Sequence, residues 1–205
     1  MRRKDKESSD PQVFEEIMAS AEVGYLAIVL DNGFPRAVPL NFVLNEGKIF
    51  FHGARAGEKF EVFTNSPGVS FTAAMALSII PSYWFGEDAC PATHLYKSAT
   101  IYGRGFIVEQ MEEKIGALTA LMNKYQPEGS FKAFDANDPL YEKSLVRTAV
   151  FKIEPSEITI KVNVAQNEDD KTKRRMIEGL TERNQGTDRA TAEEIRQTLS
   201  EPAKE

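Results

Sequence analysis

The sequence predicts a mainly β fold, an all-β core with helices attached, on three observations. Between residues 25 and 110, apolar runs rich in β-branched and aromatic residues alternate with short turn signals. Apolar residues at helical spacing are confined to the flanking and connecting segments. The strand-like runs are nearly continuous in apolar residues, which is typical of a closed or sandwiched sheet rather than one open to water.

The elements begin with a short helix, which Asp10 as N-cap and Pro11 at the first helical position predict. Strands follow at residues 25–30, 34–44 and 49–54, joined by tight turns, and we expect them to form an antiparallel meander. Pro35 and Pro39 cannot donate ladder hydrogen bonds, so the middle strand must lie at an edge, or be bulged or bent there.

The remaining pattern continues the alternation of strands and helices. Residues 79–95 break it as an apolar insertion around Trp84, which we expect to form a lid or wall near a bound cofactor. The further elements expected are a short helix in 55–68, strands at 69–77 and 98–109, a helix at 111–126, a brief helix at 138–145, a strand pair in 147–163, and amphipathic helices in 171–184 and 190–199.

The composition limits the class of protein. A length of 205 residues, 41% of them hydrophobic, fits one medium domain (1–165) with a charged helical C-terminal tail (166–205). A net charge of -6 argues against a general nucleic-acid binder. The single cysteine, Cys90, excludes an intrachain disulfide and a zinc site of several thiolates. No apolar run reaches membrane-spanning length and no secretory signal is present, so we expect a cytoplasmic protein that does not bind membranes.

Common catalytic and metal-binding motifs are absent. The glycines of Gly103-Arg104-Gly105 lack the spacing of a dinucleotide fingerprint, and the run from Gly53 to Lys59 lacks that of a phosphate loop. Asp88, Cys90 and His94 could ligate a metal, but three scattered residues in a loop do not predict a metal site.

Five segments in order resemble the nitroimidazole-resistance branch of the pyridoxamine 5'-phosphate-oxidase-like split barrels. They cover about residues 1–160. The segments are Pro39-Leu40-Asn41-Phe42, Phe51-His52-Gly53-Ala54, Gly57-Glu58-Lys59, Asn65-Ser66-Pro67-Gly68-Val69, and Tyr96-Lys97-Ser98 leading to the glycines at 103 and 105. The helix that carries Glu112-Glu113-Lys114 also resembles the long helix of that family.

The resemblance implies a split β-barrel, six-stranded, antiparallel and of Greek-key type, that forms a homodimer with FMN at the interface. It assigns the backbone of Pro39, Leu40 and Asn41 to the flavin ring, and His52 and Ala54 to the ribityl chain or ring edge. It assigns Lys59 to the phosphate, and Ser98 approaches from a later strand. A lysine at a helix start suits this role, because free N–H groups and the ammonium both attract a phosphate. The deazaflavin F420 and haem are the alternative cofactors.

The implied function is an FMN-dependent oxidoreductase that reduces nitroaromatic, nitroimidazole-like or related small molecules, with His52 as the candidate catalytic residue. The flavin supplies the electron chemistry. Its reduction needs an external donor such as NAD(P)H, for which we expect no dedicated domain in this chain. Two alternatives stay open. One is a non-catalytic flavin- or haem-binding protein with His52 or His94 as a ligand. The other is a sensor of the same fold that uses the tail from Asn167 as its contact surface.

Overall fold

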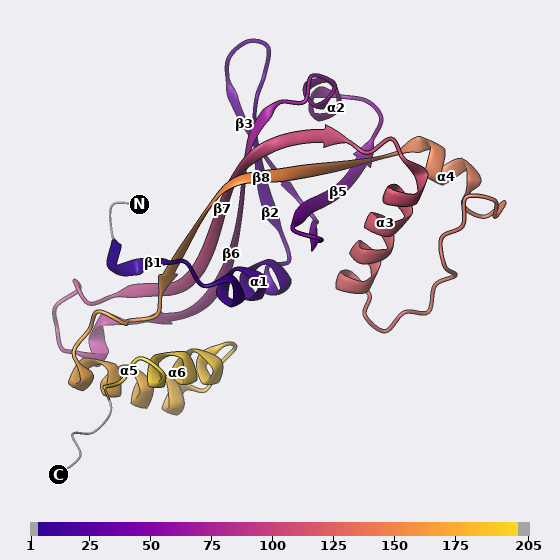
Figure 1. Ribbon diagram of the computed structural model, residues 1–205. Coiled ribbons are helices and arrows are strands. Elements are labelled where there is room, and N and C mark those ends of the chain that lie inside the picture. The colour runs from indigo at the N-terminus through magenta and orange to yellow at the C-terminus, as the bar shows by residue number, and fades with distance from the viewer. Residues whose placement is uncertain (1–3, 201–205) are drawn as a thin grey trace. The chain divides into compact units, whose positions relative to one another are not determined.

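The computed structural model describes residues 4–200, which form a mainly antiparallel β-sheet with attached helices (Figure 1). This confirms the predicted fold class. The elements are η1 (Lys4–Lys6), β1 (Glu7–Ser8), α1 (Pro11–Ser20), β2 (Gly24–Val29), β3 (Pro35–Leu40), β4 (Val43–Asn45), β5 (Lys48–Ala54), α2 (Glu58–Phe63), β6 (Gly68–Ile80), η2 (Ser82–Trp84), β7 (Thr93–Ile107), α3 (Met111–Tyr125), α4 (Glu142–Arg147), β8 (Thr148–Asn163), α5 (Asp170–Arg183) and α6 (Asp188–Arg196).

The sheet has eight strands in the order β3-β2-β6-β7-β8-β5-β4, with β1 paired to β8 off this path. Six strands are at least six residues long, whereas β1 has two residues and β4 has three. The six longer strands, β2, β3, β5, β6, β7 and β8, therefore make up most of the sheet, and β1 and β4 are short additions to it.

The predicted meander is wrong, because the run from residue 34 to 44 is divided into two strands. Leu40 at the end of β3 pairs with Gly24 of β2, whereas Val43 of β4 pairs with Phe50 of β5. The two halves therefore lie at opposite ends of the strand order. The chain changes partners at Phe42, which is fully buried and whose N–H donates to the Tyr125 hydroxyl instead of to a ladder. The predicted edge position of the proline-containing strand is confirmed, since β3 has only β2 beside it.

The predicted strand pair at 147–163 is also wrong, because this segment is the single strand β8. The strands β7 and β8 approach closely at Gly103 of β7, opposite the residue before Pro155. A Cβ atom at Gly103 would lie 2.3 Å from the carbonyl oxygen of Glu154, so only a glycine lets the two strands approach there. The Ser156 hydroxyl then donates to the Tyr102 carbonyl and holds β8 against β7.

The chain divides into two compact units. One comprises the described residues of Met1–Asp10, Ala74–Ser98 and Thr159–Glu205, and the other comprises Pro11–Ala73 and Ala99–Ile158. We call them the tail unit and the barrel unit. The strands β6, β7 and β8 contribute residues to both. The expected division of the chain at residue 165 stays a prediction.

The barrel unit has an aromatic core. The ring of Phe151 stacks on that of Phe51 at 5.1 Å and meets the ring of Phe63 edge-on at the same distance. Gly105 of β7 makes room for Phe63, because a Cβ atom there would lie 2.5 Å from that ring. A second cluster packs α3 on the sheet: Val43, Phe50, Val108, Ala117, Leu121 and Val150. Helix α3 lies near its predicted position. The residues that it buries are Lys114, Ala117 and Leu121.

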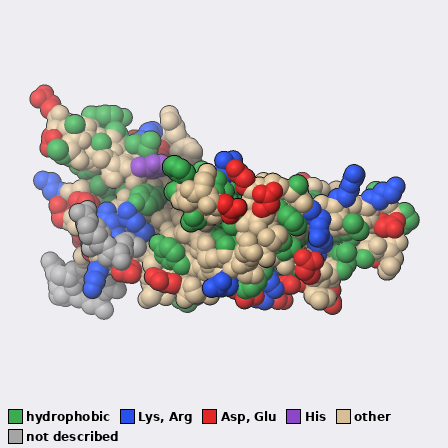
Figure 2. Space-filling view, turned by 90° about the horizontal axis from the view of Figure 1, so that it is seen from above, with side chains coloured by type: hydrophobic (Ala, Val, Ile, Leu, Met, Phe, Trp, Pro, Cys, Tyr) green, Lys and Arg blue, Asp and Glu red, His purple; other side chains and the backbone are tan. Residues whose placement is uncertain are grey.

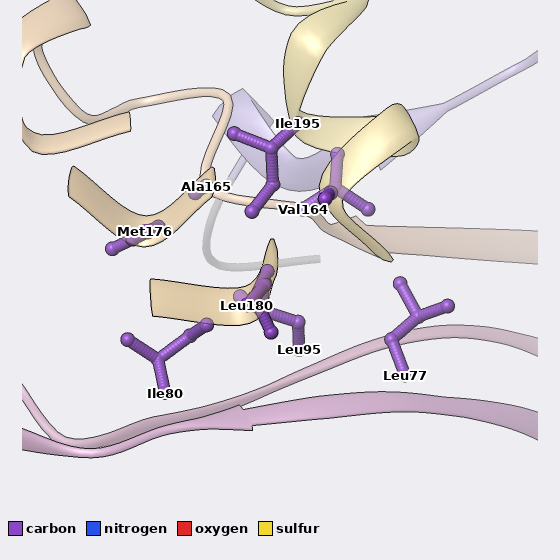
Figure 3. Close-up of a cluster of buried hydrophobic side chains, with 9 residues drawn as sticks. Leu77, Ile80, Leu95, Val164, Ala165, Met176, Leu180 and Ile195 are labelled. Carbon is purple, nitrogen blue, oxygen red and sulfur yellow. The ribbon is translucent and has the colours of Figure 1, made fainter. Parts of the chain in front are cut away.

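The tail unit is closed by α5 and α6, the two helices expected from the charged tail. Figure 3 shows side chains from β6 and β7 pointing toward those of the two helices: Leu77, Ile80 and Leu95 face Met176, Leu180 and Ile195. Trp84 packs on α5, since a Cβ atom at Gly179 would lie 2.6 Å from its ring. The predicted 79–95 insertion is shorter than expected, because β6 runs to Ile80 and β7 begins at Thr93. Tyr83 is exposed, and the expected lid stays a prediction.

The surface mixes side-chain types. On the face shown in Figure 2, acidic and basic side chains are interspersed with hydrophobic ones. Among the described residues, no helix is long and apolar enough to cross a membrane.

Candidate functional site

Six of the seven residues assigned by resemblance lie in the barrel unit, on three elements. Pro39 and Leu40 end β3 and Asn41 follows it, His52 and Ala54 belong to β5, and Lys59 lies in the first turn of α2. Ser98 lies on β7 in the tail unit and is half-buried. The ion pair of Arg36 with Glu58, at 3.0 Å, brings β3 and the start of α2 together.

The end of β3 is fastened by hydrogen bonds around one carbonyl group. The Asn41 side-chain amide donates to the Glu22 carbonyl at 3.2 Å. The Tyr125 hydroxyl also lies 2.8 Å from that carbonyl and accepts from the Phe42 N–H at 3.0 Å. Asn41 and Tyr125 therefore fix the backbone at the point where β3 gives way to β4.

One face of the β2–β3 hairpin is exposed and entirely apolar. The register pairs Tyr25 with Pro39, Ala27 with Ala37, and Val29 with Pro35, and all six residues are exposed. Tyr25 and Val29 keep 52% and 62% of their surface accessible. The opposite face carries the buried Leu26 and Ile28. An antiparallel sheet usually presents polar side chains to water, so this row, which we call the apolar row, indicates a contact surface.

His52 is exposed on β5, opposite Val150 of β8. Although the residue is exposed as a whole, partial burial of its ring and then the nearby charge of Lys59 lower the pKa of His52 below the usual histidine value. The imidazole is therefore neutral at neutral pH. It can donate one hydrogen bond and accept another, or ligate a metal of a prosthetic group, but it does not supply a proton from a resting cation.

Lys59 is a half-buried lysine whose ammonium lies over two aromatic rings. The Nζ atom is 5.3 Å from the ring centre of Phe51 and 5.1 Å from that of Phe151. Burial lowers the pKa of Lys59. Within residues 4–200 no carboxylate forms an ion pair with it. A desolvated cation without a counter-charge is costly, and a bound anion would relieve that cost.

Helix α2 itself adds little to an anion site, because it has only six residues. The ammonium has space because the neighbouring residue on β5 is Gly53. A Cβ atom there would lie 2.8 Å from the Lys59 Nζ atom. Lys59 is therefore the cation of the candidate site, and Gly53 leaves the space that its ammonium occupies.

The structure places the residues expected around a flavin on two faces of β5. Successive side chains of a strand point to opposite faces. Accordingly, His52 and Ala54 are exposed, whereas Phe51 is buried on the face where the Lys59 ammonium lies. The assigned roles of these residues stay predictions.

A basic hollow lies just beyond the β5–β8 ladder, and sequence reasoning did not find it. Arg55, Lys114 and Arg147 line this hollow of about 710 Å³ together with a single carboxylate, Glu109. The available signal was the register: Ala54 pairs with Thr148, and Arg55 and Arg147 are the residues just beyond this last pair of the ladder. That pairing joins residues far apart in the chain, which no local pattern reveals.

The described residues contain no group of three or more His, Cys, Asp and Glu side chains placed to hold a metal ion. In the 79–95 insertion, the Cys90 N–H donates to the Asp88 carboxylate, and His94 Nε2 lies 3.3 Å from the Leu77 carbonyl.

Comparison with known proteins identifies what this geometry resembles. The family model described as pyridoxamine 5'-phosphate oxidase matches residues 10–162. A candidate 5-nitroimidazole antibiotic resistance protein from Bacteroides thetaiotaomicron is 25% identical, with a TM-score of 0.61, over 76% of this chain and 86% of that one. No curated protein matches the chain.

Two further solved structures share the fold at lower identity. The flavocytochrome Anf3 from Azotobacter vinelandii is 18% identical, with a TM-score of 0.67, over 80% of this chain and 72% of that one. An FAD- and haem-binding protein from Mycobacterium smegmatis is 17% identical, with a TM-score of 0.61, over 77% and 73% of the two chains.

Proposed function

The chain belongs to the pyridoxamine 5'-phosphate oxidase family, and from this membership we propose that it is an FMN-dependent oxidoreductase. The observation that carries the proposal is the Lys59 ammonium, which is half-buried, has no acidic partner among the described residues and lies against Gly53. It fits the phosphate of a flavin mononucleotide. Flavin binding agrees with the family, and the choice of FMN rests on this cation.

The chain's residues would bind and orient the cofactor. Lys59 would hold the phosphate, and the backbone of Pro39, Leu40 and Asn41 would face the ring, because β3 is an edge strand and its outer groups have no strand to pair with. His52 and Ala54 would line the ribityl chain or ring edge, and Ser98 would approach from β7. The bound flavin supplies the electron transfer. As the candidate catalytic residue, His52 would act as a neutral hydrogen-bonding group.

The substrate class that we propose is nitroaromatic compounds or related small molecules. The Bacteroides protein, a candidate in 5-nitroimidazole resistance, supports this choice. An external donor such as NAD(P)H would reduce the flavin.

A homodimer is the second part of the proposal, and the apolar row supports it. A face made of Tyr25, Ala27, Val29 and their three β3 partners is costly to leave in water. A two-fold contact buries the same patch on both subunits, so a second copy of the chain can cover this face by itself. Because Pro39 belongs to the row, the cofactor segment and the interface would meet there.

A second candidate function is non-catalytic binding of flavin or haem. It is favoured by the names of the two structural relatives, a flavocytochrome and an FAD- and haem-binding protein. A neutral, exposed His52 suits an axial ligand. A deazaflavin such as F420 is the remaining alternative.

A visible spectrum of the purified protein during titration with FMN, F420 and haem tests the proposal. Bound FMN is expected to give the paired bands of an oxidised flavin, bleached by NAD(P)H and restored by a nitroaromatic acceptor. A sharp Soret band with no flavin bands would support the haem-binding alternative. Failure to bind any flavin would refute the proposed function.

A further inference from the structure

The basic hollow beside α3 combines residues from four separate parts of the barrel unit. Arg55 follows β5, Glu109 precedes α3, Lys114 lies on α3, and Arg147 ends α4. Ala54 and Thr148 form the last pair of the antiparallel ladder, so Arg55 and Arg147 both lie just beyond its end. The fold thus brings together two arginines that are 92 residues apart in the sequence.

The charge in this hollow is not balanced by the protein. Arg55 and Arg147 both line the hollow, and Lys114 adds a third cation. Glu109 is the single carboxylate of the lining, which leaves a net charge of +2 from three cations and one anion. Within residues 4–200, neither arginine forms an ion pair, and the described contact of Arg55 is with the Phe60 ring at 5.7 Å. The whole chain carries a net charge of -6, so this positive site stands out.

The pKa of Lys114 is affected by the positive charge of the hollow. Its ammonium is buried and donates to the carbonyl groups of Leu145 at 3.1 Å and Thr148 at 3.0 Å. Burial and then the charge of Arg55 lower the pKa of Lys114, and Glu109 compensates only in part. Lys114 therefore anchors the end of α4, and the two arginines remain available to a ligand.

We propose that this hollow binds an adenosine phosphate, with the phosphates on Arg55 and Arg147 and the base against the apolar wall of Met111 and Val146. A guanidinium group can bind two oxygens of one phosphate through two parallel N–H···O hydrogen bonds. Val146 is 61% exposed, so a planar base would cover an apolar surface that water now contacts. A volume of about 710 Å³ exceeds what a lone phosphate would fill.

The adenosine phosphate could be carried by either of two ligands. It could be part of FAD, if the flavin is a dinucleotide, or part of the nicotinamide donor. The site lies next to the ladder positions of Gly53 and Ala54, where the flavin is expected. The inference rests on the proposed function only in naming these two carriers.

Calorimetry on the flavin-free, full-length protein tests the site with ADP as the probe. The variants Arg55→Ala and Arg147→Ala are each expected to weaken ADP binding by about tenfold or more, since each removes a charge-assisted contact. The control Arg196→Ala removes the same charge from an exposed pair with Glu193 on α6, and should leave ADP binding unchanged. Inorganic pyrophosphate should bind more weakly than ADP and show the same dependence on both arginines.

The results separate this site from the phosphate site at Lys59. ADP binding that is absent from the parent, or equally strong in both arginine variants, overturns the proposal whatever FMN does. If the carrier is the cofactor, FAD binds more tightly than FMN and Arg147→Ala removes the difference. If the carrier is the donor, NADH binds more tightly than reduced nicotinamide mononucleotide, and the same variant removes that difference.

Discussion

Gly53 and Lys59 share one space in the barrel unit: a Cβ atom on Gly53 would lie 2.8 Å from the Lys59 Nζ atom. The glycine on β5 thus allows an ammonium from α2 to reach the faces of Phe51 and Phe151. The result is a desolvated cation that has no acidic partner among residues 4–200. Two predictions follow from this pair.

Replacing Lys59 by Ala should weaken FMN binding by roughly 10- to 150-fold, because a charge-assisted contact of about 1.5–3 kcal/mol is lost. Riboflavin lacks the phosphate, so its affinity should change little. The control His52→Ala should weaken both ligands, because its contact would be with the ring or ribityl chain. Fluorescence titration of the parent and the two variants with each ligand measures these affinities. Equal FMN affinity in the parent and Lys59→Ala would contradict the phosphate site.

The variant Gly53→Ala should displace the ammonium without unfolding the protein. The clash is with the far end of a flexible side chain, so the stability cost should stay below about 1 kcal/mol. FMN affinity should fall toward that of Lys59→Ala. In the Lys59→Ala background, Gly53→Ala should have no further effect on FMN binding, because the two residues act through one contact. Additive losses would show that Gly53 acts by another route.

The apolar row predicts the oligomeric state. Tyr25→Glu places a charge in a face that would be buried between two subunits, so it should shift the protein from dimer to monomer. Leu140→Glu is the control, because Leu140 is 64% exposed and lies outside the row. Light scattering at micromolar concentration measures both variants. A parent protein that is already monomeric there would rule out the dimer.

The lowered pKa of Lys124 predicts that the free energy of unfolding changes with pH in the alkaline range. Burial lowers its pKa to about 8, from 10.5 in an unfolded chain. Between these values the unfolded chain binds the proton that the folded chain has released, so stability should rise as pH increases from about 8 to 10.5. The neutral amine keeps two N–H donors for its acceptors, the carbonyls of Met18 and Ala21. Urea unfolding at several pH values should show a smaller rise for Lys124→Met, and parallel curves would contradict this assignment.

The depressed pKa of Asp188 predicts that the tail unit loses stability in acid. The Arg183 guanidinium, the Ser78 hydroxyl and the Gln185 N–H all donate to this buried carboxylate and hold its pKa well below its usual range. The folded pKa is depressed, so the contribution is present above about pH 4 and is lost as pH falls below it.

Asp188→Asn should therefore cost about 2–3 kcal/mol at neutral pH, reduced from the cost of a fully buried pair because Arg183 is partly exposed. The cost should shrink in acid. Trp84, which lies 5.0 Å from the Arg183 guanidinium, is the single tryptophan of the chain and reports unfolding of this unit by fluorescence. A variant with unchanged stability would mean that water replaces the network without cost.

The sequence by itself determined the elements and the fold class. Alternating apolar residues, turn residues and helical spacing are local signals, so the helix after Pro11, the long helix ending at Tyr125 and the two tail helices were predicted near their observed positions. The resemblance carried by the segments from Pro39 to Lys59 also identified the family.

Only the tertiary structure decided which strands pair and which side chains meet. The residues on either side of Phe42 belong to hairpins at opposite ends of the strand order. The strands β7 and β8 can approach closely at Glu154 because Gly103 of β7 has no side chain. Arg55 and Arg147 line the same hollow, and this likewise depends on the register between the distant strands β5 and β8. Local sequence patterns encode the backbone φ and ψ preferences and the face of an element to which each side chain points. The choice of strand partners is decided by the burial of the whole core.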